Sequence, residues 1–207
     1  MNRLVLASAS PRRADLMRRE GYSFEVIEPP LHEPDRFAGG LSATEQAEAS
    51  SYFKARSVAS RLTSPALVIG ADTVVLLKDE VFGKPSDVHD ARRILSSLAD
   101  TTHRVITGLT VLDSRTDRRI IVHDTTIVTM RPMPEPAMEQ YLTGGAWRGK
   151  AGAYGIQDEG DAFIERIDGS FENVMGLPTE LLAEVLSYWE VGRQPGSSPA
   201  REGSARR

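Results

Sequence analysis

The first residues whose types and spacing could do chemistry lie at positions 7–13, where an apolar stretch runs into the sequence ASASPRR. Ser10 before Pro11 is a typical helix start, with a hydroxyl at the N-cap and proline at the first helical position. Free backbone N–H groups and the helix dipole attract an anion there, whereas Arg12 and Arg13 are disfavoured in a first turn unless an anion compensates them. The segment predicts a phosphate-binding turn. The alternative is a capped surface helix with solvated arginines.

A carboxylate follows a second apolar stretch of the sequence. Asp72 lies in the tetrapeptide Gly-Ala-Asp-Thr, directly after the apolar residues 67–69. An acid at the end of a buried strand lies where open α/β sheets place their ligand crevice. There it can bind a divalent ion or accept a proton from water. The alternative is an aspartate turn, in which the side chain hydrogen-bonds to its own backbone.

Further polar residues lie in positions from which they could serve the same site. Lys54 falls within an expected helix and Lys84 in a Gly-Lys-Pro turn, and either could reach a phosphate or simply be solvated. The segment KAGAYGIQ, residues 150–157, has glycines that allow a close backbone approach to a ligand, and its Gln157 could pair with the edge of a base. This segment could also be an ordinary loop. Glu33, in a proline-rich loop, is a possible second metal carboxylate.

The elements that must position these residues alternate along the chain. Strands are expected at 3–7, 24–27, 66–69, 74–77, 103–112, 119–130 and 163–167, and helices at 11–20, 42–62, 87–98, 134–142 and 178–189. Residues 70–73 are expected to interrupt a strand, and Ser42 with Glu45 predicts a capping box. Interleaved helices and strands predict an α/β or mixed α+β fold with a central sheet, in one domain over residues 1–191.

Composition and charge limit the classes of protein. The 207 residues include no cysteine, which excludes disulfides, thiolate metal sites and a cysteine nucleophile. No apolar stretch is long enough for a membrane span or a signal peptide, so we expect a cytoplasmic protein. Residues 192–207 contain four arginines and one acid and are expected to be a disordered tail.

Removing this tail from the formal net charge of −4 leaves a body of −7. Five arginines and two acids make the first twenty residues locally basic. A basic start on an acidic body is a possible anion site. Acidic bodies bind nucleic acid poorly without a focused basic stripe, so no nucleic-acid partner is expected.

Five motifs occur together and in order: LASASPRR, GADT, GKP, KAGAYGIQ and, at residues 173–178, NVMGLP. Over residues 3–190 the chain resembles the Maf proteins, nucleoside triphosphate pyrophosphatases once described as septum formation inhibitors. The resemblance implies a two-lobed α/β (mixed α+β) fold similar to the inosine triphosphate pyrophosphatases, with a central mixed sheet and a cleft between the lobes. It also implies a divalent cation, Mg²⁺ or Mn²⁺, and a homodimer.

The resemblance implies a role for each matching residue, in an enzyme that cuts a nucleotide between its α- and β-phosphates. Asp72 would be the catalytic acid and, with Glu33, would hold the metal. Phosphate contacts would come from Ser8, Arg13, Lys54 and Lys84. Arg12, Thr73 and Gln157 would set specificity, in a combination that resembles the dTTP/UTP subfamily. The sequence around Glu33 is Leu-His-Glu-Pro rather than the usual acidic run. A different class, also open, is a non-catalytic regulator of cell division that binds a nucleotide or a partner.

Overall fold

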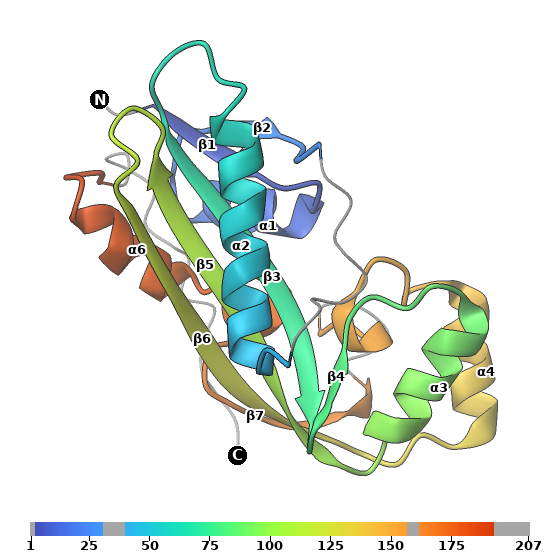
Figure 1. Cartoon of the computed structure of the whole chain (residues 1–207). Coiled ribbons are helices and arrows are strands. Elements are labelled where there is room, and N and C mark those ends of the chain that lie inside the picture. The colour runs from blue at the N-terminus through green and yellow to red at the C-terminus, as the bar shows by residue number, and fades with distance from the viewer. Residues whose placement is uncertain (1–2, 31–39, 157–161, 193–207) are drawn as a thin grey trace.

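The computed structural model describes residues 3–30, 40–156 and 162–192, and within them one sheet of seven strands runs through the molecule (Figure 1). The strand order is β2-β1-β3-β5-β6-β7, with β4 paired to β3. The strands are β1 (Leu4–Ala7), β2 (Glu25–Ile27), β3 (Leu67–Leu77), β4 (Glu80–Phe82), β5 (Thr102–Asp113), β6 (Arg119–Met130) and β7 (Ile164–Asp168). The pairs β1–β2 and β1–β3 are parallel and all others antiparallel, which confirms the prediction of a central mixed sheet.

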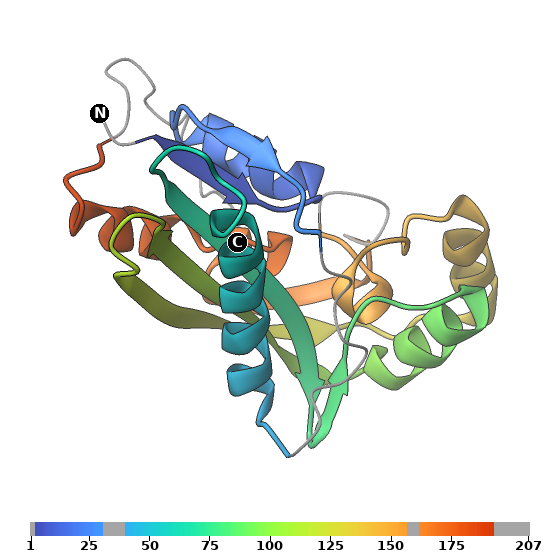
Figure 2. The same ribbon diagram turned by 45° about the horizontal axis from the view of Figure 1, so that its top comes forward.

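Helices cover both faces of this sheet and build a second lobe beside it. Helix α2 (Ala43–Ala59) lies on one face, and α1 (Pro11–Arg19), α5 (Phe171–Met175) and α6 (Thr179–Ser187) lie on the other (Figure 2). The helices α3 (Val88–Leu98) and α4 (Glu135–Gly144) stand apart from the others, on the far side of β4, which pairs with the last residues of β3 (Figure 1). The expected two-lobed α/β architecture is therefore present.

The interruption expected at residues 70–73 is wrong, because β3 continues through them as one strand of 11 residues. Strand β5 pairs with β3 without a break from Leu67 to Leu76, and this long ladder keeps the backbone extended. The other edge of β3 is shared between two short strands. β1 pairs with β3 as far as Gly70, and the pairing with β4 starts at Val75. Among the described residues, no strand covers this edge at 71–74, so the sheet opens there.

Two glycines bring α2 close to the sheet at this opening. A Cβ added to Gly70 would lie 2.2 Å from the carbonyl oxygen of Ser51, and one added to Gly108 would lie 2.3 Å from the α2 backbone. The helix can therefore rest almost directly on β3 and β5. This seating brings Lys54, one turn after Ser51, over the part of β3 that carries Asp72. The predicted capping box at the start of α2 is also confirmed.

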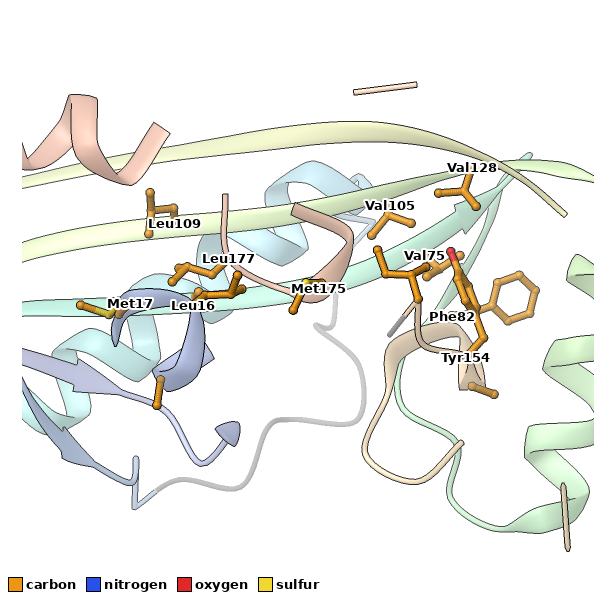
Figure 3. Close-up of a cluster of buried hydrophobic side chains, with 14 of the residues drawn as sticks. Leu16, Met17, Val75, Phe82, Val105, Leu109, Val128, Tyr154, Met175 and Leu177 are labelled. Atoms are coloured by element: carbon orange, nitrogen blue, oxygen red, sulfur yellow. The ribbon is translucent and has the colours of Figure 1, made fainter. Parts of the chain in front are cut away.

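The main core lies between the sheet and α1, α5 and α6 and extends into the second lobe. Figure 3 shows part of it, from Leu16 and Met17 of α1 to Phe82 and Tyr154. The short elements that were not predicted include β4, which ends where the turn at 82–85 was expected, and α5, which has five residues. Residues 193–207 lie outside the described part of the chain, so a disordered tail stays a prediction.

Candidate active site

A cleft of about 620 Å³ lies beside the open edge of β3. Its described charged residues are six cations and two acids: Arg12, Arg13, Lys54, Lys84, Arg148 and Lys150, with Glu28 and Asp72. The expected site residues Ser8 and Thr73 line it as well. All expected site residues that the structure describes are thus brought together. The cleft is strongly positive in a chain of net charge −4, so its lining suits a polyanion.

The turn from β1 into α1 forms one end of the cleft. Ser10 is the N-cap and Pro11 the first helical residue, as predicted, but the Ser10 hydroxyl makes no capping hydrogen bond. Instead the hydroxyl of Ser8 accepts a bond of 3.1 Å from the backbone N–H of Ser10. The expected hydroxyl cap is therefore wrong. The Ser10 side chain therefore does not occupy the N–H groups of the first turn.

Arg13 is built into the wall of the cleft rather than solvated. Its side chain is buried, with the residue 8% exposed. Nε donates to the carbonyl oxygen of Gly176 at 2.7 Å, and Nη2 donates to the hydroxyl of Thr73 at 3.1 Å. Nη1 makes a longer contact of 3.5 Å with the hydroxyl of Ser8. These bonds tie the N-terminal turn to β3 and to the end of α5, and they exclude the surface-helix alternative for this arginine.

A chain of hydroxyl groups holds Thr73 from behind. The hydroxyls of Thr73 and Thr107 lie 3.0 Å apart, and Thr107 donates to the carbonyl oxygen of Asn173 at 3.1 Å. Thr107 therefore accepts from Thr73, which leaves Thr73 with oxygen lone pairs for Arg13 and for a ligand. Asn173 is fully buried and donates to the carbonyl oxygen of Val105. The motif at 173–178, for which the sequence predicted no contact, thus supports Thr73 and Arg13.

Asp72 and Thr73 are neighbours on β3, and their side chains point to opposite faces of the sheet. Asp72 points toward α2, where Lys54 Nζ lies 2.5 Å from its Oδ1, and both side chains are only about one-tenth exposed. Both residues line the cleft because no described strand pairs with β3 at residues 71–74 on the edge that faces the second lobe. The aspartate-turn alternative is wrong, since Asp72 lies within a continuous strand and bonds to Lys54.

The opposite side of the cleft is formed by loops of the second lobe. Lys84 follows β4, and Arg148 stacks on the ring of Trp147 with its guanidinium carbon 5.1 Å from the ring centroid. Lys150 is buried, and its side chain passes so close to Gly155 that an added Cβ would lie 2.7 Å from Nζ. Arg148 was missed from sequence, and Lys150 was predicted only as the first residue of the segment 150–157, although GAWRGKAG does combine cations with glycines.

Arg12 and Glu28 complete the described lining of the cleft. Arg12 reaches across the cleft, with Nη2 3.5 Å from the carbonyl oxygen of Gly149. Glu28, directly after β2, was also missed from sequence. It lines the cleft because β1 and β2 are parallel and their carboxyl ends lie together. Glu33 and Gln157 lie outside the described residues, so their expected roles stay predictions.

The described residues contain no group of three or more His, Asp or Glu side chains that could hold a metal by themselves. Two described carboxylates, Asp72 and Glu28, line the cleft. Mg²⁺ is commonly held by one or two carboxylates together with substrate phosphates, and such a donor set fits this cleft. Within the same residues, no helix combines the length and apolar character needed to cross a membrane.

A mixed α/β sheet with a cationic cleft at the end of its parallel strands, built around a buried aspartate, defines a class of proteins that bind polyanionic ligands. The chain belongs to the Maf family: the family model described as "Maf-like protein" matches residues 3–189.

Two relatives are similar over nearly their whole length. The chain is 40% identical over 186 residues to a dTTP/UTP pyrophosphatase of Pelotomaculum thermopropionicum, covering 90% of this chain and 96% of that protein. It is equally similar to a dTTP/UTP pyrophosphatase of Alkaliphilus metalliredigens, covering 90% and 95%. A crystal structure of a nucleoside-triphosphatase / dITP/XTP pyrophosphatase from Mycobacterium abscessus matches with a TM-score of 0.40 and 14% identity, over 64% of this chain and 76% of that one, which is too distant to argue from.

Proposed function

We propose that this chain hydrolyses the α–β phosphoanhydride of dTTP and UTP, releasing the nucleoside monophosphate and pyrophosphate. The observation that carries the proposal is the set of six cations that line the cleft around the buried Asp72. A nucleoside triphosphate carries about four negative charges, and its hydrolysis depends mainly on positioning and charge neutralisation. The substrate class follows the names of the two relatives that are 40% identical.

In this proposal the phosphates lie between the two sides of the cleft. Arg13 and the N-terminal turn with Ser8 hold them from the sheet side, and Lys84 holds them from the second lobe. Lys54 orients the carboxylate of Asp72 through their 2.5 Å contact. Asp72 then orients or deprotonates the water that attacks the α-phosphorus.

We also propose a divalent cation, Mg²⁺ or Mn²⁺, held by Asp72 with Glu33 as the second carboxylate. Lys54 bonds to Oδ1 of Asp72, and among the described residues Oδ2 has no other partner, so it is available to a ligand. When bound, the ion supplies charge neutralisation at the α-phosphate and lowers the pKa of a coordinated water. The described carboxylate Glu28 lines the same cleft and is an alternative to Glu33.

Base selection is proposed to depend on Arg12, Thr73 and Gln157. The hydroxyl hydrogen of Thr73 is directed to Thr107, so Thr73 offers the base an acceptor. Thymine and uracil carry an N–H donor at the position where cytosine has an acceptor. A wrong base would leave buried polar groups without partners, and this loss can discriminate strongly.

The protein is further proposed to act in the cytoplasm as a homodimer, which fractionation and sedimentation would test.

The test is product analysis over a panel of nucleoside triphosphates, with and without EDTA. We expect pyrophosphate from dTTP and UTP and no release without metal. Orthophosphate would instead indicate a phosphatase that removes the terminal phosphate. Tight nucleotide binding without any product would favour the non-catalytic regulator. A preference for 7-methyl-GTP over dTTP and UTP would contradict the proposed substrate class.

A further inference from the structure

A buried pair of polar side chains, His103 and Tyr154, lies behind the cleft and has no part in the roles above. His103 Nε2 and Tyr154 Oη are 2.8 Å apart, and the two rings meet edge to face with centroids 5.5 Å apart. The residues are only 2% and 5% exposed. Figure 3 shows Tyr154 beside the apolar Val75, Phe82 and Val105, with its hydroxyl oxygen directed toward the sheet.

This hydrogen bond is one of those that join the cleft segment, residues 150–156, to distant parts of the chain. The backbone N–H of Gly152 donates to a carbonyl of the loop after β4 at 3.0 Å, and Tyr141 of α4 donates to the carbonyl oxygen of Ala153 at 3.3 Å. Both of these bonds lead into the second lobe. His103 lies on β5, so its bond to Tyr154 joins the segment to the central sheet.

The polar character of the pair needs an explanation. An apolar pair of the same shape would fill the space without the cost of removing polar groups from water. Among the described residues His103 Nδ1 has no hydrogen-bond partner, which adds to this cost. Burial lowers the pKa of His103 to about 4, so the ring is neutral at pH 7. What the pair adds over apolar packing is direction: the hydrogen bond fixes where the Tyr154 ring stands.

We propose that His103 is a positioning residue for nucleotide selection and that it acts through Tyr154. Tyr154, Gly155 and Ile156 line the cleft, so the bond fixes part of the surface that a nucleotide meets. The bond holds this segment at a set distance from Thr73 on the sheet. Without it the segment keeps its packing against Val75 of β3 but loses this directed bond to β5, so Tyr154 offers the nucleotide a less defined contact. The inference rests on the proposed function for the identity of the ligand.

The test compares the affinities of non-hydrolysable α,β-methylene analogues of dTTP and dGTP by calorimetry, alongside pyrophosphate release from the natural nucleotides. Tyr154→Phe removes a single oxygen atom, and His103→Phe removes the bond from the other side. We expect each to lower the preference for dTTP about 10-fold, mostly through weaker binding of the dTTP analogue. The double variant should lose no more than either single one, because both remove the same bond.

Two further variants separate positioning from general stability. In His103→Gln an amide can still bond to the phenol, so most of the preference should return. His123→Gln is the matched control, since His123 also bonds through its ring (Nδ1 to Glu48 at 2.8 Å) but neither residue lines the cleft. It should leave the preference unchanged.

The proposal is overturned if Tyr154→Phe and His103→Phe lower the melting temperature but keep the preference within twofold, or if their effects multiply in the double variant. It is also overturned if the unaltered protein binds both analogues equally. If the protein binds the dTTP analogue selectively but releases no pyrophosphate, the proposed function fails, and the variants still decide the role of His103.

Discussion

Each side of the cleft carries three cations, but the two sides are built differently. On the sheet side, Arg13 and Asp72 are 8% and 7% exposed, and each is bonded to neighbours that are themselves fixed by β3, α2 or α5. On the side of the second lobe, Lys84 and Arg148 are exposed and lie on loops. One side is thus organised before a ligand arrives, and the other presents two of its three cations on exposed side chains, with Lys150 buried.

This difference suggests a division of work between the two sides. Groups that must meet the transition state within a few tenths of an ångström need a rigid support, and losing one of them lowers turnover. Exposed cations on loops attract and hold a polyanion in the ground state as well, so their loss raises KM more than it lowers kcat. The predictions below test whether the two sides separate in this way.

The largest effect is expected for Asp72→Asn. The amide keeps the shape but cannot take a proton or hold a cation as a carboxylate does, so kcat should fall by about 10³-fold or more while KM changes little. Steady-state pyrophosphate release from dTTP measures it, with folding checked by circular dichroism. Asp79→Asn, an exposed acid in the turn after β3, is the control. Near-normal turnover in Asp72→Asn would show that Asp72 is not the catalytic acid.

A smaller loss is expected for Arg13→Lys. Lysine keeps the charge but cannot form the separate bonds that Arg13 makes to Gly176 and Thr73. We expect kcat/KM for dTTP to fall about 100-fold, with most of the loss in kcat. Arg18→Lys on the same helix, where Arg18 forms an exposed pair with Asp15, should be unaffected. A loss confined to KM would show that the buried sheet side does not differ from the second lobe.

Lys84→Met tests the other side of the cleft. Removing one exposed cation should raise KM for dTTP about 10-fold and change kcat less than about threefold. The increase should shrink at high salt, because exposed charges are screened. Lys78→Met, an exposed lysine between β3 and β4, is the control. If kcat falls as strongly as in Arg13→Lys, Lys84 acts in the transition state and the division between the two sides is wrong.

The residues predicted from the sequence are those with strong local signals. The turn at 7–13 combines a strand end, a proline and two arginines, and Asp72 follows an apolar strand. For both, neighbours in the chain were enough to indicate a site. Confirming that these residues meet required the parallel pairing of β1 with β3, which brings residues more than sixty positions apart together.

What could not be predicted depends on contacts between distant parts of the chain. The continuity of β3 comes from its ladder with β5, which outweighs the local turn tendency of Gly70. The support of Thr73 by Thr107 and Asn173 joins three separate elements, each ordinary in its own sequence context. Lys150 lies in a glycine-rich sequence that is typical of a loop. Only its burial beside Gly155 distinguishes it from a solvated lysine.

The last prediction concerns His103, in the core between the two sides of the cleft. At neutral pH its titration has the smallest effect of those considered, and the effect is on stability. Burial lowers the pKa of His103 from 6.5 to about 4. Between these values the unfolded chain binds a proton that the folded chain does not, so the unfolding free energy falls as the pH drops. We expect His103 to contribute about 2 kcal/mol to this fall between pH 7 and pH 5.

Urea unfolding of the unaltered protein and of His103→Phe at both pH values measures this contribution. The carboxylates titrate in both proteins and cancel in the difference, so the variant should lose about 2 kcal/mol less stability on acidification. At pH 7 the ring is neutral in the folded protein and mostly neutral in the unfolded one, so titration contributes little there. An equal loss in both proteins would mean that water reaches His103. The contact between His103 and Tyr154 would then be hydrated rather than part of a continuous dry core.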